Sequence, residues 1–234
     1  MAVTANSVIS PQAPKVYTAS INNGDASAWK LLRDNAFLGA GGGAVGGAGS
    51  GTTGSKFTSI VATSTDTTAR NVQLAIARSV SCTVTSVSPG VVTISAGSNI
   101  ANGDQVIFSA ATMPTGLTAG TTYFAVSASP GSSATFSVAA TFGGTAINTS
   151  STGTTVIVYV IRILTTIPVA ITAGTDGATA SGYFLNTTYW PGVPVDNDGN
   201  PYLFLESNDF LAGSCTGTVT SGKIINLSAI GANF

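Results

Sequence analysis

Short segments with alternating apolar and polar side chains run through most of this 234-residue chain. In residues 71–78, for example, Val72, Leu74 and Ile76 fall on one face of an extended chain. A period of two fits a half-buried strand, and the Gly, Asn, Asp and Pro residues between the segments fit turns. The pattern predicts an all-β protein. The expected strands are residues 56–63, 71–78, 91–95, 105–109, 122–127, 134–139, 155–164, 202–206 and 223–230.

The distribution of charge divides the chain into two parts. Of 8 basic and 9 acidic residues, only Asp104 lies between residues 83 and 155. The strands on either side of this stretch are apolar and end in basic residues, as in a hairpin whose tip carries an inserted domain. We therefore expect a jelly-roll-like β-sandwich core formed by residues 1–82 and 156–234, with a second, small β-sandwich or barrel domain, residues 83–155, inserted in it.

Two segments near the N-terminus do not follow the strand pattern. Residues 25–38 fit either a helix capped by Asp25 and carrying Trp29, Leu32 and Phe37, or a strand that runs into a loop. Residues 39–54 contain nine glycines and no charge, which predicts a flexible loop. This loop lacks the Gly-Lys-Ser/Thr ending of a phosphate-binding loop and precedes an expected strand, so we expect no phosphate site there.

The charge content is low for a protein that lives alone in solution. Only 7% of the residues are charged, the net charge is -1 and the mean hydropathy is +0.39. Such a surface favours association, and the high apolar content disfavours disorder. The most apolar run, residues 156–171, is interrupted by Arg162 and Pro168, which predicts no membrane span. No basic stripe is present either, so we expect no nucleic acid and no membrane among the partners.

The residue types needed for common catalytic and metal sites are scarce. The chain has no histidine and one glutamate, Glu206, which excludes Ser-His-Asp and Cys-His catalysis and most zinc sites. Asp196, Asp198 and Asn200 resemble the start of a calcium loop, but Pro201 and Ser207 stand where such a loop needs Gly and Glu. We therefore expect a turn, and no catalytic, cofactor-binding or metal-binding residues.

Three other groups of residues have a structural and a functional interpretation. Asp66 and Arg70 bracket the sequence TDTTAR, where we expect an ion pair that braces a turn, and Asp176 before a glycine also predicts a turn. The two cysteines, Cys82 and Cys215, match no metal motif, and we expect buried free thiols. The third group is an aromatic cluster, expected in the core or anchoring a loop, or else forming a surface that stacks on sugars or binds subunits. Its members are Tyr183, Phe184, Tyr189 and Trp190.

Several segments resemble virion proteins of bacteriophages. Residues 103–147, GDQVIFSAATMPTGLTAGTTYFAVSASPGSSATFSVAATFGGTAI, are similar to a β module scattered through such proteins. The flanking parts resemble a structural family often encoded near the major capsid gene. The matching pieces are residues 7–12, 59–78, 167–177, 191–207 and 219–234. The long glycine loop and the inserted module depart from that family. The resemblance implies a virion protein and does not by itself assign it to head or tail.

Composition and resemblance together give one leading hypothesis and two others. The first is a capsid decoration or cement protein, a homo-oligomer located in the virion after assembly in the bacterial host cytoplasm. Its partners would be the major capsid protein and copies of itself, bound through apolar, low-charge β surface. The second is a tail component, such as a tube, baseplate or fibre protein with an adhesive, carbohydrate-binding β module. The third, an enzyme, is disfavoured by the missing catalytic residue types.

Overall fold

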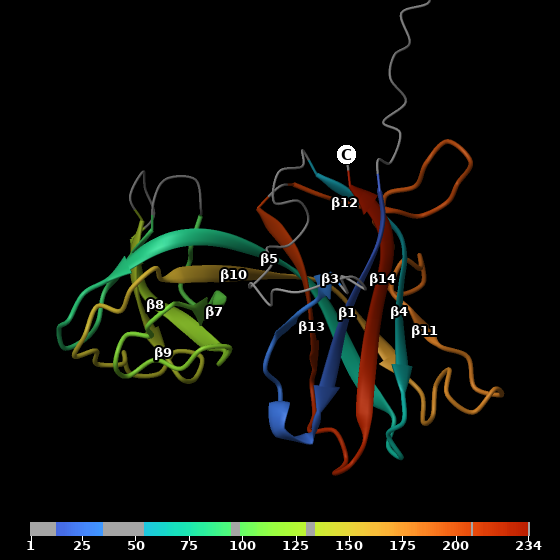
Figure 1. Cartoon of the computed structure of the whole chain (residues 1–234), viewed down its shortest axis with the longest axis horizontal. Coiled ribbons are helices and arrows are strands. Elements are labelled where there is room, and N and C mark those ends of the chain that lie inside the picture. The colour runs from blue at the N-terminus through green and yellow to red at the C-terminus, as the bar shows by residue number, and fades with distance from the viewer. Residues whose placement is uncertain (1–12, 35–53, 95–98, 130–133, 207, 234) are drawn as a thin grey trace, which may run out of the picture.

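The computed structural model describes residues 13–34, 54–94, 99–129, 134–206 and 208–233, without the side chains of residues 13–15, 33–34 and 233. The described chain is almost entirely β-structure, as predicted (Figure 1). The flexible loop expected at residues 39–54 lies outside the described residues except for Gly54. The strands are β1 (Ala13–Asn22), β2 (Lys30–Leu31), β3 (Arg33–Asp34), β4 (Ser55–Ser64), β5 (Arg70–Val84), β6 (Val92–Ile94), β7 (Gln105–Ser109), β8 (Tyr123–Ser129), β9 (Thr135–Ala139), β10 (Ile157–Val169), β11 (Gly182–Tyr183), β12 (Leu203–Leu205), β13 (Asp209–Cys215) and β14 (Ile224–Asn233).

The larger lobe is a β-sandwich with the strand order of a jelly roll. Its first sheet runs β11-β4-β14-β1-β3, with β12 also paired to β4. The facing part of the second sheet runs β10-β5-β13-β2. The chain changes sheets between β1 and β2, β2 and β3, β4 and β5, β10 and β11, β12 and β13, and β13 and β14. This is the connectivity of a double-sheet jelly roll. The jelly-roll-like sandwich predicted from the sequence is therefore the fold of this lobe.

The two sheets of the sandwich enclose one apolar core. Alternation places Tyr17 and Ile21 of β1 and Leu74 of β5 on the inner faces, where they are at most 4% exposed. Gly213 of β13 lies so close to the first sheet that a Cβ atom there would overlap the side chain of Leu227. The two sheets approach each other so closely at Gly213 that this position requires glycine. This explains why a buried strand contains a residue without a side chain.

The smaller lobe is a closed ring of six strands. The order β5-β6-β9-β8-β7-β10 is completed by direct pairing of β10 with β5. β5 has 15 residues and β10 has 13, and the two pair in antiparallel register from Arg70 opposite Val169 to Ser81 opposite Ile157. β5 and β10 therefore form one long antiparallel pair. Its two strands belong to the sandwich at one end and to the ring at the other, as the long green and gold strands in Figure 1 show.

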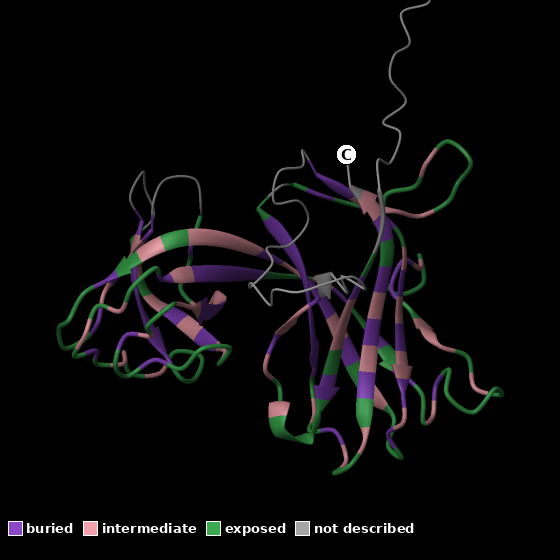
Figure 2. Ribbon diagram, in the orientation of Figure 1, coloured by how far each residue is buried: buried purple, intermediate pink, exposed green. Residues whose placement is uncertain are grey.

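The ring encloses a second apolar core, separate from that of the sandwich. Its buried members include Val92, Phe108, Phe136, Val84 and Val158. Figure 2 shows buried residues in both lobes and along the long strands that connect them. The core of the ring extends beyond residues 83–155. The half-buried Val80 and Cys82 of β5 pack against it, and further buried members lie on β10 or directly before it. The members on the β10 side are Val156, Val158 and Val160.

The segment before the glycine-rich loop contains no α-helix in its described part. Asn22, and not Asp25, caps the short 3-10 helix η1 (Asn23–Asp25), and β2 and β3 follow. The helical interpretation of residues 25–38 is wrong as far as residue 34, and residues 35–38 are not described. Strand formation prevails because Lys30 and Leu31 pair with the edge of β13.

Candidate functional site

In the described strands β1, β14, β4 and β11, the outer face of the first sheet carries only neutral side chains over three consecutive cross-strand rows. The pairing registers fix which residues lie opposite one another. We call these residues the neutral face. The rows are Ser20, Asn226 and Thr63; Thr18, Ser228, Val61 and Tyr183; and Val16, Ile230 and Ser59.

Strand alternation makes the neutral face both exposed and partly apolar. Tyr17 and Leu227 point into the core, so their neighbours Val16 and Ser228 point outward. Val16 is 46%, Ile230 48% and Tyr183 55% exposed. Exposed apolar side chains of this size among neutral neighbours are typical of surfaces that become covered in an assembly. The neutral face ends at β3, where Arg33 pairs with Thr18 of the middle row.

The aromatic cluster expected from the sequence is divided between core and surface. Phe184 is fully buried in the sandwich core, and Trp190 packs against that core. Tyr183 belongs to the neutral face, while Tyr189 is 44% exposed and its backbone oxygen accepts a hydrogen bond from Thr165 Oγ1. The core interpretation therefore holds for Phe184 and Trp190, and the two tyrosines remain available to a partner.

A loop of the sandwich bridges the two lobes. Residues 23–29 connect β1 to β2, and Trp29 at the end of this loop is 2% exposed. Its indole N–H donates to Gln105 Oε1 on β7 of the ring, and its backbone N–H donates to Thr122 Oγ1. Trp29 belongs to a third apolar cluster that joins the lobes. The other buried members are Ala75, Ala77, Ile107, Tyr159, Ile161, Phe210 and Ala212.

Two hollows flank Trp29 in the cleft between the lobes. One, of about 480 Å³, is lined by residues that include Leu31, Ile107 and Phe210. The other, of about 550 Å³, is lined by residues that include Gln73, Gln105 and Phe124. Both volumes lie within the roughly 300–1,000 Å³ of small-molecule sites in proteins.

An aromatic pair extends the second hollow toward the surface. Phe124 lies opposite Gln105 in the β7–β8 pair, so the two side chains share a face. The ring centroids of Phe124 and Phe142 are 6.2 Å apart in an edge-to-face arrangement, and Phe142 is 75% exposed. Gly103, with a φ of +90°, lies under the Phe142 ring where a Cβ atom would collide with it.

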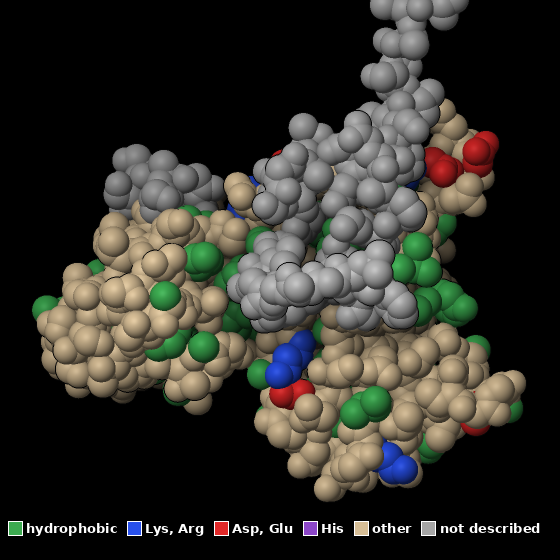
Figure 3. Space-filling model, viewed as in Figure 1, with side chains coloured by type: hydrophobic (Ala, Val, Ile, Leu, Met, Phe, Trp, Pro, Cys, Tyr) green, Lys and Arg blue, Asp and Glu red, His purple; other side chains and the backbone are tan. Residues whose placement is uncertain are grey.

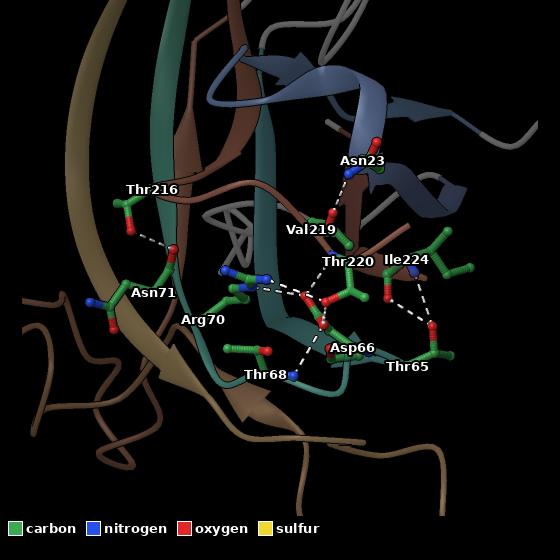
Figure 4. A network of polar contacts seen from close by, with 11 residues as sticks. Asn23, Thr65, Asp66, Thr68, Arg70, Asn71, Thr216, Val219, Thr220 and Ile224 are labelled. Atoms are coloured by element: carbon green, nitrogen blue, oxygen red, sulfur yellow. Dashed lines mark hydrogen bonds and ion pairs between the residues drawn. The ribbon is translucent and has the colours of Figure 1, made fainter. Parts of the chain in front are cut away.

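The ion pair expected between Asp66 and Arg70 is present and belongs to a larger network (Figure 4). Arg70 Nε lies 2.8 Å from Asp66 Oδ2, and the Asp66 side chain is fully buried. Asp66 also accepts hydrogen bonds from the backbone N–H groups of Thr68 and Thr220 and from Thr220 Oγ1. The carboxylate thus ties the β4–β5 turn to the segment that leads into β14.

The network stabilises the charged form of Asp66. Burial alone raises the pKa of a carboxyl group, but the hydrogen bonds from Thr220 and Arg70 outweigh burial here. The pKa of Asp66 therefore lies well below its ordinary value of 3.8. The contacts of this buried carboxylate are all with its own chain, so Asp66 stabilises the fold. Asp66 faces neither the cleft between the lobes nor the neutral face.

The residues that resembled a calcium loop form a tight turn. Asp196 Oδ1 accepts hydrogen bonds from the backbone N–H groups of Asp198 and Asn200, at 3.0 and 2.8 Å. The Asn200 bond is the main cause that lowers the pKa of Asp196. Asp176 caps a second turn in the same way, through Ala178 and Thr179. The described part of the chain contains no group of three or more residues suited to a metal ion.

Most described charged side chains are paired within the chain. Four sets of ion pairs involve Lys30, Arg70, Arg78 and Arg162 as the cations. Arg78 contacts both Glu206 and Asp209, and Lys56 lies over the Tyr202 ring. Figure 3 accordingly shows one side of the molecule with few blue and red side chains. Among the residues that the structure describes, no helix is long and apolar enough to cross a membrane.

Both cysteines are free thiols, as expected, but the expected burial is found only for Cys215. Cys215 is buried in the sandwich core, and Cys82 is half-buried at the ring, where desolvation raises the pKa of its thiol to about 12. A thiol with such a pKa is almost fully protonated near pH 7 and is therefore a poor nucleophile.

Sequence reasoning missed the cleft and the neutral face. The cleft joins Trp29, Gln73, Gln105 and Phe124, which lie far apart in the chain and show no motif. The alternation of polar and apolar residues in β1 and β14 was the available signal for the neutral face, but only pairing aligns the strands into rows. Comparisons with known protein families, with curated proteins and with solved structures find no match for this chain.

Proposed function

We propose that this protein is a non-enzymatic structural component of a bacteriophage virion, and specifically a capsid decoration or cement protein. The observation that carries the proposal is the neutral face, on which exposed Val16, Ile230 and Tyr183 lie among hydroxyl and amide side chains. Burial of such a face against another protein removes apolar area from water and desolvates no charge of the four strands that form the face. The resemblance of residues 103–147 and of the flanking segments to virion proteins supplies the biological context.

The size of the neutral face favours a lattice over an isolated partner. Four strands about 4.8 Å apart and five residues at about 3.4 Å each cover roughly 300 Å². A stable two-protein interface buries about 800 Å² on each partner. A single contact through this face is therefore weak. Binding becomes strong on a symmetric particle, which presents many sites and brings neighbouring copies of the protein into contact.

The role of the smaller lobe follows from its attachment. The ring is joined to the sandwich by β5 and β10, and the segment that it adds between residues 83 and 155 carries Asp104 as its only charge. We propose that the sandwich binds the capsid through the neutral face and that the ring projects from it. The partners are then the major capsid protein and neighbouring copies of this chain.

Reconstitution on heads tests the proposal. Purified protein is added to expanded heads that lack it, and the copy number per head and the survival of heads on heating are measured. We expect saturation at a number fixed by the lattice and improved survival. Ser228→Asp places a charge at the centre of the neutral face and should abolish binding, since the charge would have to be desolvated.

A matched control separates binding from folding. Ser86→Asp makes the same substitution at an exposed position of the smaller lobe and should bind heads like the unmodified protein. Thermal melts of both variants check that the fold is intact. Failure of the unmodified protein to bind heads, or equal binding by Ser228→Asp, would contradict the capsid role.

A second candidate is a tail component with an adhesive β module. The favouring observation is Phe142, which is 75% exposed on the smaller lobe, because a large exposed aromatic side chain is suited to a surface ligand. Binding of the purified protein to tails and not to heads in the same assay would favour this alternative.

A further inference from the structure

The second hollow of the interlobe cleft has the chemistry of a site for an uncharged ligand. Its lining includes two glutamine side chains, the hydroxyl-bearing residues Thr121 and Thr122, and the ring of Phe124. The only charged groups in the lining, Asp25 and Lys30, form an ion pair of 2.5 Å with each other. A charged ligand would meet no unbalanced charge there.

The orientation of Gln105 is fixed by the protein. An indole N–H can only donate, so the bond from Trp29 requires the amide oxygen of Gln105 to face the tryptophan. The amide N–H groups of Gln105 then point away from Trp29, and no hydrogen bond from them to a described residue is formed. One end of this side chain is held in place and the other is available to a ligand.

Gln73 brings a second amide to the same hollow. It lies on β5 with the same parity as Ala75 and Ala77, which face the interlobe cluster, and it is half-buried. Within the described structure its side chain makes no hydrogen bond. Half-buried amide groups without protein partners in a hollow favour a ligand that both donates and accepts hydrogen bonds, because an amide offers both functions.

The aromatic pair adds an apolar platform beside these amides. Phe124 contacts the hollow and Phe142, and the exposed Phe142 ring is held over Gly103. A pyranose ring presents C–H groups on one face and hydroxyl groups on its edge. The C–H groups are attracted to the negative face of an aromatic ring, and the hydroxyl groups suit amides.

We propose that this cleft binds a neutral oligosaccharide, with Gln73 and Gln105 contacting hydroxyl groups and the Phe124–Phe142 pair packing against sugar rings. The site differs from the exposed Tyr189, which lies on the sandwich and shares no described contact with the cleft. It is also separate from the neutral face, so the same copy can bind a particle and a sugar chain.

Amide chemical-shift titration of the full chain tests the proposal. The probes are maltotetraose, cellotetraose and chitotetraose at millimolar concentrations, with tetragalacturonate as the charged counterpart. We expect saturable shifts from at least one neutral probe, centred on residues 119–124 and on Gln105. Binding of tetragalacturonate alone would overturn the assignment to a neutral ligand, and no saturable shift from any probe would overturn the site.

Variants locate the site. Phe142→Ala should weaken binding about tenfold, a loss of about 1.4 kcal/mol, and Phe142→Tyr should retain it. Because Phe142 is exposed, neither change should alter the fold.

Tyr189→Ala removes an exposed aromatic side chain from the sandwich and should leave binding unchanged. Loss of binding in Tyr189→Ala, with retention in Phe142→Ala, would overturn the proposal. Head binding by Phe142→Ala should persist, which separates this test from that of the capsid role.

Discussion

At the scale of single residues, the Asp66 carboxylate combines burial with several polar contacts. Its carboxylate is buried and accepts hydrogen bonds from Thr68, Arg70 and Thr220. Each of these donors comes from a turn or segment that the carboxylate holds in place. Loss of the charge would leave Arg70, which is 20% exposed, without its partner.

We predict that Asp66→Asn lowers the free energy of unfolding by about 3 kcal/mol, because it breaks a buried ion pair and leaves its partners unsatisfied. Urea denaturation at neutral pH measures the change. Asp176→Asn is the control, since the Asp176 carboxylate also caps a turn but is fully exposed to solvent. An equal loss in both variants would contradict the special role of the buried carboxylate.

The same residue predicts how stability depends on pH. The pKa of Asp66 is lowered on folding, so the stabilisation is complete above the ordinary value of 3.8 and is lost as the pH falls below it. The chain has no histidine, and we expect little change in stability between about pH 6 and pH 8. Denaturation at a series of pH values should show an acid-side decline that is smaller in Asp66→Asn. If the stability of the unmodified protein and of Asp66→Asn declined identically, the decline would be due to carboxylates other than Asp66.

At the scale of secondary-structure elements, the sequence predicted strands where one face is buried and the other is exposed. β7 (Gln105–Ser109) agrees with the prediction at both ends. β13 was missed because every one of its residues is buried, from Phe210 toward the interlobe cluster to Leu211 toward the sandwich core. A strand covered on both faces has no alternation to detect.

Two other differences between the predicted and the observed strands have physical causes. β1 was missed because the small or polar side chains around Tyr17 and Ile21 give a weak pattern, and its stability comes from pairing with β14 more than 200 residues away. β5 is longer than predicted because it continues from the sandwich into the ring. The residues of the cleft could not be grouped from sequence, since pairing and lobe packing bring them together.

The β1–β2 loop gives a prediction for the joint between the lobes. Trp29→Ala removes a side chain of the buried cluster that also contains Ile107 of the ring and Phe210 of the sandwich. We expect both lobes to stay folded and their relative orientation to become variable, because β5 and β10 remain as the connection. Residual dipolar couplings should fit one common alignment in the unmodified protein and two different alignments in the variant.

The second tryptophan provides the matched control. Trp190→Ala removes a side chain that packs against the sandwich core, away from the joint. It should lower the stability of the sandwich and leave the two lobes with one common alignment. If Trp29→Ala also keeps a common alignment, the shared strands alone fix the joint.

At the scale of the whole molecule, the two lobes share strands and each has its own core. Ser81 of β5 lies directly opposite Ile157 of β10, so the hairpin can be closed by a short turn in place of the ring. We predict that replacing residues 82–156 with Asn-Gly leaves a folded sandwich, because this dipeptide favours the two-residue hairpin turn. Amide spectra should retain the sandwich resonances. Their collapse would mean that the sandwich depends on the ring.

The reverse experiment determines which residues the ring needs in order to fold on its own. A fragment of residues 83–155 lacks the parts of β5 and β10 that close the ring, and it lacks the core residues Val156, Val158 and Val160. A fragment of residues 78–162 contains both shared segments and keeps the ion pair of Arg162 with Asp104. We therefore predict that the longer fragment unfolds cooperatively and that the shorter one does not.

The longer fragment should nevertheless be less stable than the ring in the full chain. Tyr159 and Ile161, which Trp29 and Phe210 cover in the full chain, become exposed to water in the fragment. Each large apolar side chain contributes about 1.5–3 kcal/mol when it is fully buried, so loss of the cover lowers the free energy of unfolding measurably. Urea titrations of both fragments, followed by circular dichroism and dispersed amide spectra, measure these differences. Cooperative unfolding of the 83–155 fragment at the same urea concentration as the 78–162 fragment would mean that the inserted stretch folds without the shared strands.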